Sequence, residues 1–585
     1  MFYRTAGPSA TGSAAESGPP LAAGPGSGAL APGVPAGMLV TPALAVACPS
    51  SSRRAGESAL VCGPAGGGVD GLTSGDQVVL WHPVAVAPVK VKRDGSVLVD
   101  AWVPEVARLG VLEEALGPET IEELCARYGL VVRRRRLISW AFVVRCVLAA
   151  TVMPDADWTE VQMRLAGLLA AAPLARPWHP AGPGDLAQRR AKIPVAVFGE
   201  LFWRLAGPVD DGSGPGLTWR GLLVCATDGF LTRIPDTKAN RAHFGSAGTS
   251  DDSAPFPQLQ AQIVCVAGNR ADLGAAWGPA SDGEQTLTWR LVHEHPEIFA
   301  AGRVIIFDRC WPGAELVAAI ARLGAHVICR LKSGLDFPLE GPCGDGSHAT
   351  HLDTAAGPLP ARLIDYALDT PRDQVDGGRD PDGCYTLLTT LTDPGAYPAA
   401  EIAALYPMRW SGVESLIGEN KSAITGAGPS AGPMLRSTTP HQIDQEMYAW
   451  LAACQALRIT GHGALQAAGP AGAGGARIPV RARGGIRDVS GDPVTARELP
   501  FTLARREAVR SIMCNAAATP AHLAAACLSA WRRILARLHP RRPTRHRPRV
   551  CKWRPAFPAP KTRPVTVTGA TAITVFGAPA AAGGP

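Results

Sequence analysis

Two aspartates in the middle of the chain each follow a short apolar run. Asp228 comes after residues 221–227 (GLLVCAT), and Asp308 comes after residues 303–307 (RVIIF). Such runs are typical of buried strands, so each acid would be delivered to a strand end. Two carboxylates brought close together repel each other, and a divalent cation is the usual remedy. The pair therefore indicates a metal site, although either aspartate alone could instead cap a following turn or helix.

A third acid, Glu414, could complete such a site. It lies in the segment 406–421, seven residues before Lys421, so the two side chains share one face of a predicted helix. Lys421 could then hold a phosphate beside the metal, and Arg409 could bind another. Carboxylate oxygens suit Mg²⁺, and two such ions ~3.5–4 Å apart can activate water in phosphoryl transfer. The alternative is a surface helix whose Glu and Lys are merely solvated.

Strands and helices alternate around these acids. After the first acid we expect a strand at 260–267, then the strand that leads to Asp308, a helix at 315–323 and a strand at 326–331. This order predicts an α/β sheet with functional groups at strand ends. Residues 334–395 contain turns and short β-type runs, which predicts a mostly β insertion. Helical patterns return at 398–406, 414–421 and 440–458.

The N-terminal part of the chain has two kinds of sequence. Residues 1–75 are rich in Ala, Gly, Pro and Ser, and we expect them to be disordered. Residues 106–169 have helical periodicity, including an apolar run at 138–153, and residues 170–190 read as a linker. Four consecutive basic residues beside this apolar run could contact a DNA backbone or form a solvated face: Arg133, Arg134, Arg135 and Arg136.

The C-terminal part is strongly basic. The whole chain has a net charge of +7, yet residues 516–585 contain twelve Lys and Arg and no Asp or Glu. Such a tail favours a polyanionic partner, nucleic acid before membrane, with a solvated tail as the alternative. Its densest stretch comprises Arg541, Arg542, Arg545, Arg547 and Arg549.

Cysteine usage and hydropathy limit the class of protein further. The fourteen cysteines are scattered singly, which argues against a zinc ribbon and a disulfide framework and favours a reducing cytoplasm. No stretch reaches ~18 uninterrupted apolar residues, so we expect no membrane partner. The segment before residue 47 lacks a clean apolar region, which disfavours secretion.

The segment around Glu414 resembles the Y-(2)-R-(3)-E-(6)-K motif of DDE transposases of the insertion-sequence-four family. Tyr406, Arg409, Glu414 and Lys421 match this motif, but four residues rather than three separate the arginine from the glutamate. Other blocks agree in order and content across roughly residues 106–555. These are Ala226 to Gly229 with Ile234 to Thr237, Asn240 and Phe244-Gly245; Phe307 to Arg309; Leu435 to Ser437 with Pro440; and Pro548 to Val550 with Lys552.

The resemblance implies an α/β fold with a ribonuclease-H-like catalytic core and a β insertion between the second aspartate and the glutamate. A small helical N-terminal domain would precede the core, and disordered tails would flank it. The implied boundaries are 1–100 low-complexity; 101–190 helical DNA-binding domain; 191–333 and 398–460 the two parts of the core; 334–397 the β-rich insertion; and 461–585 linker, short helices and basic tail.

The resemblance also implies a function. Asp228, Asp308 and Glu414 would bind two Mg²⁺ or Mn²⁺ ions and catalyse cut-and-paste DNA transposition. Tyr406, Arg409 and Lys421 would contact DNA near the terminal phosphate. The partners would be double-stranded element ends and target DNA, with a homodimer on the DNA and a cytoplasmic, nucleoid-associated location.

Two other functions remain open from the sequence. One is a transposase-derived protein that binds DNA without cutting it. The other is a two-carboxylate glycosidase, which would leave Arg409, Lys421 and the basic tail without a role. Salt-sensitive DNA binding would count against the glycosidase.

Overall fold

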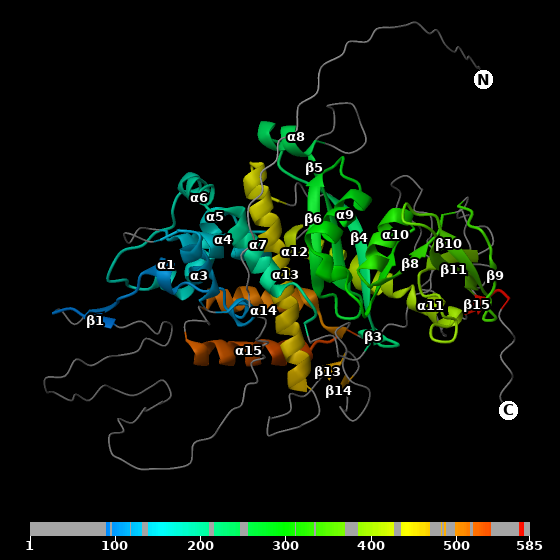
Figure 1. Cartoon of the computed structure of the whole chain (residues 1–585). Coiled ribbons are helices and arrows are strands. Elements are labelled where there is room, and N and C mark those ends of the chain that lie inside the picture. Colours follow the sequence, from blue (N-terminus) through cyan, green and yellow to red (C-terminus); the bar gives the residue numbers. More distant parts are fainter. Residues whose placement is uncertain are drawn as a thin grey trace, which may run out of the picture. The chain divides into compact units, whose positions relative to one another are not determined.

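The structure is a computed structural model of the whole chain (Figure 1). The residues that it describes are 89–93, 96–117, 119–131, 138–209, 216–245, 256–309, 312–332, 335–368, 384–425, 435–468, 481–482, 485–486, 498–514, 519–539 and 573–577. The predicted disorder of residues 1–75, the run Arg133 to Arg136 and the basic stretch Arg541 to Arg549 lie outside these residues.

One mixed sheet dominates the described part of the chain and contains eleven strands there. Along the sheet the order is β6-β5-β4-β7-β8-β12-β11-β10-β9, with β3 paired to β4 and β15 paired to β11. Only the pairs β4–β7 and β7–β8 are parallel among the described strands. The strand bounds are β3 Thr218–Trp219, β4 Leu222–Arg233, β5 Gln258–Val266, β6 Asp272–Pro279, β7 Arg303–Phe307, β8 His326–Arg330, β9 Gly341–Pro342, β10 Ser347–Leu352, β11 Leu359–Leu368, β12 Cys384–Thr389 and β15 Ile573–Val575.

The sheet separates two apolar cores because side chains alternate between its faces. On β4, Val224 and Ala226 belong to the larger core, whereas Leu223 and Cys225 belong to the smaller one. The smaller core lies under α9 (Glu284–Glu294) and α10 (Ala314–Arg322), which supply Leu287, Leu291, Leu316 and Ile320. The continuous burial explains why β4, β5 and β7 read as unbroken apolar runs in the sequence.

The larger core packs the sheet against helices from both ends of the chain. Helix α13 (Pro440–Ala468, yellow in Figure 1) is central to it and packs against α4, α7, α14 and α15. The other bounds are α1 Val103–Val106, α2 Leu112–Leu116, α3 Thr120–Arg127, α4 Trp140–Val152, α5 Trp158–Ala166, η1 Gly167–Ala171, α6 Pro183–Arg190, α7 Val195–Leu205, α8 Lys238–Phe244, η2 Pro296–Phe299, α11 Ala399–Leu405, η4 Trp410–Glu414, α12 Ser415–Thr425, α14 Phe501–Met513 and α15 Pro520–Leu535.

Several local predictions differ from the structure. The strand predicted to end at Asp228 continues to Arg233, because β4 keeps pairing with β5 after its partner β7 has ended. The predicted linker at 170–190 contains α6, which begins at Pro183, a residue that suits the first position of a helix. The helix predicted for 440–458 continues to Ala468.

The apolar run at 138–153 forms the buried helix α4, with the Ser139 side chain accepting a hydrogen bond from the Phe142 backbone. Arg145 interrupts this run in the sequence. Its guanidinium is fully buried and pairs with Glu113 and Glu122, so the charge is compensated inside the helical layer. None of the described helices is both long and apolar enough to cross a membrane.

Two further pairs of short strands lie outside the large sheet. They are β1 Val89–Val91 with β2 Val97–Val99, and β13 Arg481–Ala482 with β14 Gly485–Ile486. The strands of residues 341–389 do not form a separate sheet. They extend the large one, because β12 pairs with β8.

Candidate active site

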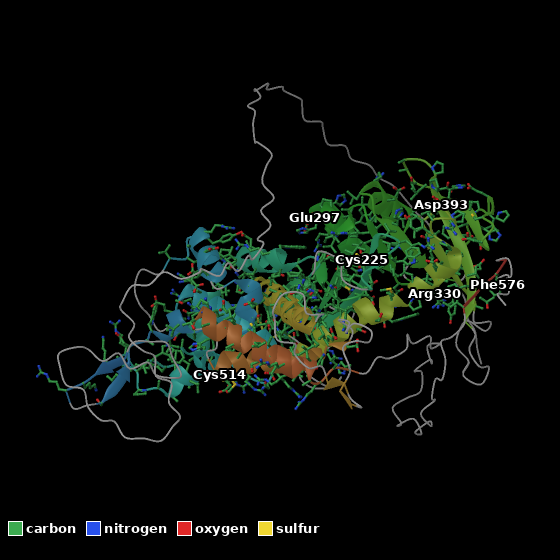
Figure 2. The ribbon with its side chains drawn as sticks, turned by 90° about the horizontal axis from the view of Figure 1, so that it is seen from below. Cys225, Glu297, Arg330, Asp393, Cys514 and Phe576 are labelled. Atoms are coloured by element: carbon green, nitrogen blue, oxygen red, sulfur yellow. The ribbon has the colours of Figure 1, made fainter. Side chains whose placement is uncertain are left out.

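The parallel pairing of β4 and β7 brings the two aspartates together. The register runs from Leu223 opposite Arg303 to Ala226 opposite Ile306. Continued for two residues, the same register sets Asp228 opposite Asp308. Both acids therefore lie where the parallel pair ends. Asp228 comes three residues after Cys225, which Figure 2 labels. By the alternation along each strand, both side chains belong to the face that carries the larger core.

Glu414 reaches this edge from a helix on the same face. It ends the π-helical turn Trp410–Glu414, which leads into α12. Gly412 lets the turn approach the sheet closely, because a Cβ at this position would lie only 2.8 Å from the Cα of Ala267. The glycine is thus required by the contact between the turn and the end of β5.

The π turn also accounts for the additional residue between Arg409 and Glu414. A π turn closes i→i+5 hydrogen bonds, so it takes one residue more than an α turn. The two side chains consequently stay on one side of the helix and interact directly: Arg409 Nη2 donates to Glu414 Oε1 at 2.6 Å. The departure from the family spacing is absorbed locally and does not displace the glutamate from the site.

All three acids converge on the guanidinium of Arg409. Besides the bond to Glu414, Arg409 Nη1 donates to Asp228 Oδ2 at 2.9 Å and lies 3.9 Å from Asp308 Oδ2. The arginine side chain is 5% exposed, against 15% for Asp228 and about a third for the other two acids. A single buried cation thus holds together carboxylates that would otherwise repel each other.

The electrostatics of the cluster favour a bound cation. Burial raises the pKa of Asp228 above its ordinary range, and the charges of Asp308 and Glu414 raise it further, while Arg409 opposes them. The backbone N–H of Gly229 donates to Asp228 Oδ1 at 3.0 Å. One arginine therefore faces three carboxylates where the parallel pair of β4 and β7 ends.

The chemistry of the donor set fits a divalent metal, and Arg409 acts as its stand-in. Carboxylate oxygens are the ligands that Mg²⁺ and Mn²⁺ prefer. Within the described residues no group of three or more His, Cys, Asp or Glu is spaced as a ready metal site. The reason is geometric: the carboxylates are turned toward the guanidinium. Metal binding requires them to turn from it toward the ion.

The other residues of the motif differ in how they are placed. Tyr406 is 2% exposed, and burial raises the pKa of its hydroxyl to about 12. Its ring packs edge-on against Trp410. Lys421 belongs to α12, but its side chain lies outside the described residues. DNA contact by Tyr406 and Arg409 remains a prediction, and both side chains would have to leave their buried positions to make it.

The sequence did not single out two residues that interact with the acids or with each other. Glu284, the first residue of α9, interacts electrostatically with Asp228 and Asp308. Lys332, which follows β8, interacts in turn with Glu284. The sequence signal for Glu284 was weak: an acid after Asp282-Gly283, ahead of apolar residues at helical spacing.

The block after Asp228 and the block after Glu414 touch each other. Asn240 is fully buried and donates to the backbone carbonyls of Pro235 and Ser437. Thr237 Oγ1 donates to the carbonyl of Thr438 at 2.8 Å. The block after the first aspartate and the block after the glutamate therefore form one structural unit beside the acids.

Two family models match this chain. The first, described as the N-terminal part of insertion element 4 transposase, covers residues 106–203. The second, the transposase DDE domain, covers residues 219–427 and thus contains all three acids. The chain belongs to the insertion element 4 family of DDE transposases. As a DDE transposase it binds DNA and uses divalent metal.

One curated relative agrees with this family. The chain is 25% identical over 361 residues to the transposase InsG of insertion sequence element IS4 from Escherichia coli K12, a match that covers 59% of this chain and 75% of InsG. Among solved structures, a piggyBac transposase synaptic complex with hairpin DNA matches with a TM-score of 0.35 and 11% identity, over 73% of this chain and 82% of that one.

Proposed function

We propose that this transposase cuts its insertion sequence free and joins it to target DNA at the site formed by Asp228, Asp308 and Glu414. The observation that carries the proposal is their convergence. Three acids from β4, β7 and the π turn, far apart in sequence, all lie within 4 Å of one guanidinium. A carboxylate triad at the edge of a sheet can hold metal against a DNA phosphate.

Two Mg²⁺ or Mn²⁺ ions, once bound, would supply an activated water and stabilise the leaving oxygen of the cut strand. The part of the protein is to place the oxygen ligands. Asp228 and Asp308 are set by the register of β4 and β7, and Glu414 by the π turn. After the first cut, the freed 3′-OH of the element would attack the next phosphodiester bond.

We assign to Arg409 the role of a positioning residue in the metal-free protein. Its bonds to Asp228 and Glu414 keep the acids oriented before the metal arrives. Released by the ion, the guanidinium would become free to pair with a DNA phosphate, as the family resemblance implies. Tyr406 and Lys421, which belongs to α12, would contact the same DNA strand.

The strand order supports a ribonuclease-H-like core. In the run β6-β5-β4-β7-β8, each of the first three strands is antiparallel to its neighbour in that group. The next two strands, β7 and β8, are parallel to β4. In the same proposal, the helices of residues 101–190 form a DNA-binding unit and the strands of 334–397 an insertion. The residues from Arg133 to Arg136 and the C-terminal arginines would contact DNA. The protein would act as a homodimer on paired element ends, in the nucleoid.

The decisive experiment is cleavage of DNA that carries the inverted repeats flanking the gene. With Mg²⁺ or Mn²⁺, the full-length chain should nick at the element ends, and Asp228→Asn, Asp308→Asn and Glu414→Gln should each lower the rate by at least a hundredfold. Glu297→Gln, which changes a carboxylate that is 68% exposed (Figure 2), should cleave like the unchanged chain.

Two results would overturn the proposal. If the unchanged chain binds these ends but does not cut them with either metal, the chain is a DNA-binding protein without nuclease activity. If cleavage survives the loss of any one acid at its normal rate, the site lies elsewhere.

A further inference from the structure

A fourth carboxylate approaches the acids from the opposite face of the sheet. Glu284 opens α9, which packs on the smaller core through Leu287 and Leu291. Asp228 projects toward the larger core, so its neighbour Gly229 faces the side on which α9 lies. Glu284 and Glu414 therefore reach the same edge from the two sides of β4.

Gly229 creates the space that Glu284 occupies. A Cβ at Gly229 would lie 2.6 Å from Glu284 Cγ and 2.7 Å from Glu284 Oε1. It would also lie 2.8 Å from Gln260 Nε2. Such distances are not tolerated, so any larger residue would displace the glutamate and the glutamine. Gly229 has no positive φ, and β4 continues straight through it, so the backbone does not require a glycine here. Because Gly229 has no side chain, Glu284 can lie close to β4 directly after Asp228.

The side-chain amide of Gln260 and the Glu284 carboxylate share the space over Gly229. Among the described residues, no hydrogen bond to the Glu284 carboxylate is present. The charged groups that act on it electrostatically are Asp228 on β4, Asp308 after β7, Arg409 before the π turn and Lys332 after β8. Burial, followed by the two aspartates, raises the pKa of Glu284 to about 7. Glu284 thus adds a fourth carboxylate to the charges that act on Asp228 and Asp308, and carboxylates brought together favour the binding of a divalent cation.

We propose that Glu284 is a fourth carboxylate of the divalent-metal site, facing the ion from the side of β4 opposite Glu414. This inference rests on the proposed function, because it adds a ligand to that same site. Its ordinary alternative is a carboxylate in the first turn of a helix, which only favours the helix dipole. The two roles differ in one measurable quantity, the affinity for metal.

The test is Mn²⁺ binding to the full-length chain, followed by electron paramagnetic resonance of the free ion in a titration without substrate turnover. Glu284→Gln should weaken the tighter binding step at least tenfold. Glu294→Gln removes the same charge from the exposed far end of the same helix and should bind Mn²⁺ as tightly as the unchanged chain. Equal affinities for Glu284→Gln and the unchanged chain would overturn the proposal.

A second variant acts through the space at Gly229. Gly229→Ala should displace Glu284 and weaken Mn²⁺ binding, and combining it with Glu284→Gln should add little to either single change. Fully additive losses would mean that Gly229 and Glu284 act independently, which contradicts the proposal. Circular dichroism of each variant controls for misfolding.

Asp228→Asn separates this inference from the proposed function. If Asp228→Asn abolishes binding and Glu284→Gln leaves it unchanged, the triad stands and only the fourth ligand is refuted. If the unchanged chain takes up no Mn²⁺, alone or with DNA carrying its element ends, the proposed function itself fails.

Discussion

Arg409 decides how the acids are arranged at the scale of single residues. A guanidinium is planar and carries donors on both terminal nitrogens, so it can bind two carboxylates at once. Here one nitrogen binds Asp228 and the other binds Glu414. If the acids bind metal as proposed, the metal and the arginine would compete for the same oxygens, and each could compensate for the loss of the other.

Replacing this arginine should make stability depend on metal. In EDTA, Arg409→Gln leaves the mostly buried Asp228 and the two half-buried acids without their counter-ion, and we expect the free energy of unfolding to fall by about 2 kcal/mol. Millimolar Mg²⁺ should recover much of this loss, because a ligand that binds only the folded state stabilises it.

Urea denaturation of both chains, with EDTA and with Mg²⁺, measures the effect. Arg409→Lys keeps the charge but cannot bind two carboxylates with one planar group. Its stability in EDTA should therefore lie between that of the unchanged chain and that of Arg409→Gln. A glutamine variant as stable as the unchanged chain in EDTA would refute the stand-in role of Arg409.

Sequence patterns predicted that the three acids would lie together, as they do, but not their contacts. Asp228 and Asp308 were recognisable because an apolar run before a carboxylate is a local signal. The inward orientation of Arg409 was not, because it depends on a π turn and on two strands more than 100 residues away. Glu284 was missed for the same reason: its approach depends on the space left by Gly229.

The π turn Trp410–Glu414 is the feature that matters most at the scale of elements. It packs on the end of β5 through Gly412 and sets the direction of Glu414. A π turn inserted in an α-helix changes the chain only locally, so the flanking turns keep their packing. The four-residue spacing in this chain and the three-residue spacing of the family should therefore be interchangeable.

Deletion of Ser411 tests this equivalence. The side chain of Ser411 donates only to the carbonyl of Met408, and its removal should convert the π turn into an α turn with Arg409 and Glu414 still on one face. We expect cleavage within about threefold of the unchanged rate. Insertion of an alanine at the same place should abolish cleavage, because no regular helical turn accommodates it. Loss of activity on deletion would show that the π turn itself is required.

A second link between elements joins β6 to α13. Arg458 Nη1 donates to Asp272 Oδ2 at 3.1 Å, and both side chains are buried. Burial raises the pKa of Asp272 from 3.8 to about 6, although Arg458 opposes the shift. The folded chain therefore holds this proton more tightly than the unfolded chain does. The resulting contribution to stability is complete below about pH 3.8 and is lost as the pH rises through about 6.

Asp272→Asn should remove this pH dependence. The unfolding free energies of the unchanged chain and of the variant are measured by urea denaturation between pH 4 and pH 6.5. The advantage of the unchanged chain should decrease as the pH rises. The difference should be smallest at pH 7.5, where Asp272 is ionised in both states and its burial is least favourable. A flat difference curve would mean that Asp272 is ionised in the folded state throughout this range.

At the scale of the whole molecule, Arg436 joins the catalytic part to the N-terminal helices. Its guanidinium donates to the backbone carbonyls of Ala150 and Met153 at the end of α4, and to that of Ala156. Glu446 on α13 holds the backbone of Arg436 in place. This explains structurally why the block around Arg436 accompanies the glutamate in the family resemblance.

Arg436→Ala should lower the free energy of unfolding by about 3 kcal/mol, because several carbonyls lose a charged donor. Limited proteolysis should then release the N-terminal helices earlier than in the unchanged chain. Arg532→Ala, at an exposed position of α15, provides the control and should have little effect. Unchanged stability in Arg436→Ala would mean that the helical layer is held by apolar packing alone.

The architecture was predictable only as far as local patterns reach. The alternation of strands and helices between residues 221 and 331 predicted an α/β sheet, and the sheet is there. That the strands of residues 341–389 would join the same sheet was not predicted, because β12 pairs with β8 across more than fifty residues. Pairing between distant strands leaves no periodic signal in either segment.

The pairing of β4 with β7 makes the active site an all-or-none structure. A slip of one residue between these strands would turn Asp308 away from Asp228 and toward the opposite core, since neighbouring side chains point to opposite faces. No partly assembled triad of intermediate activity should therefore exist. The lengths of the loops between the strands, in contrast, do not set this register, so residues added or removed there should leave the positions of the acids unchanged.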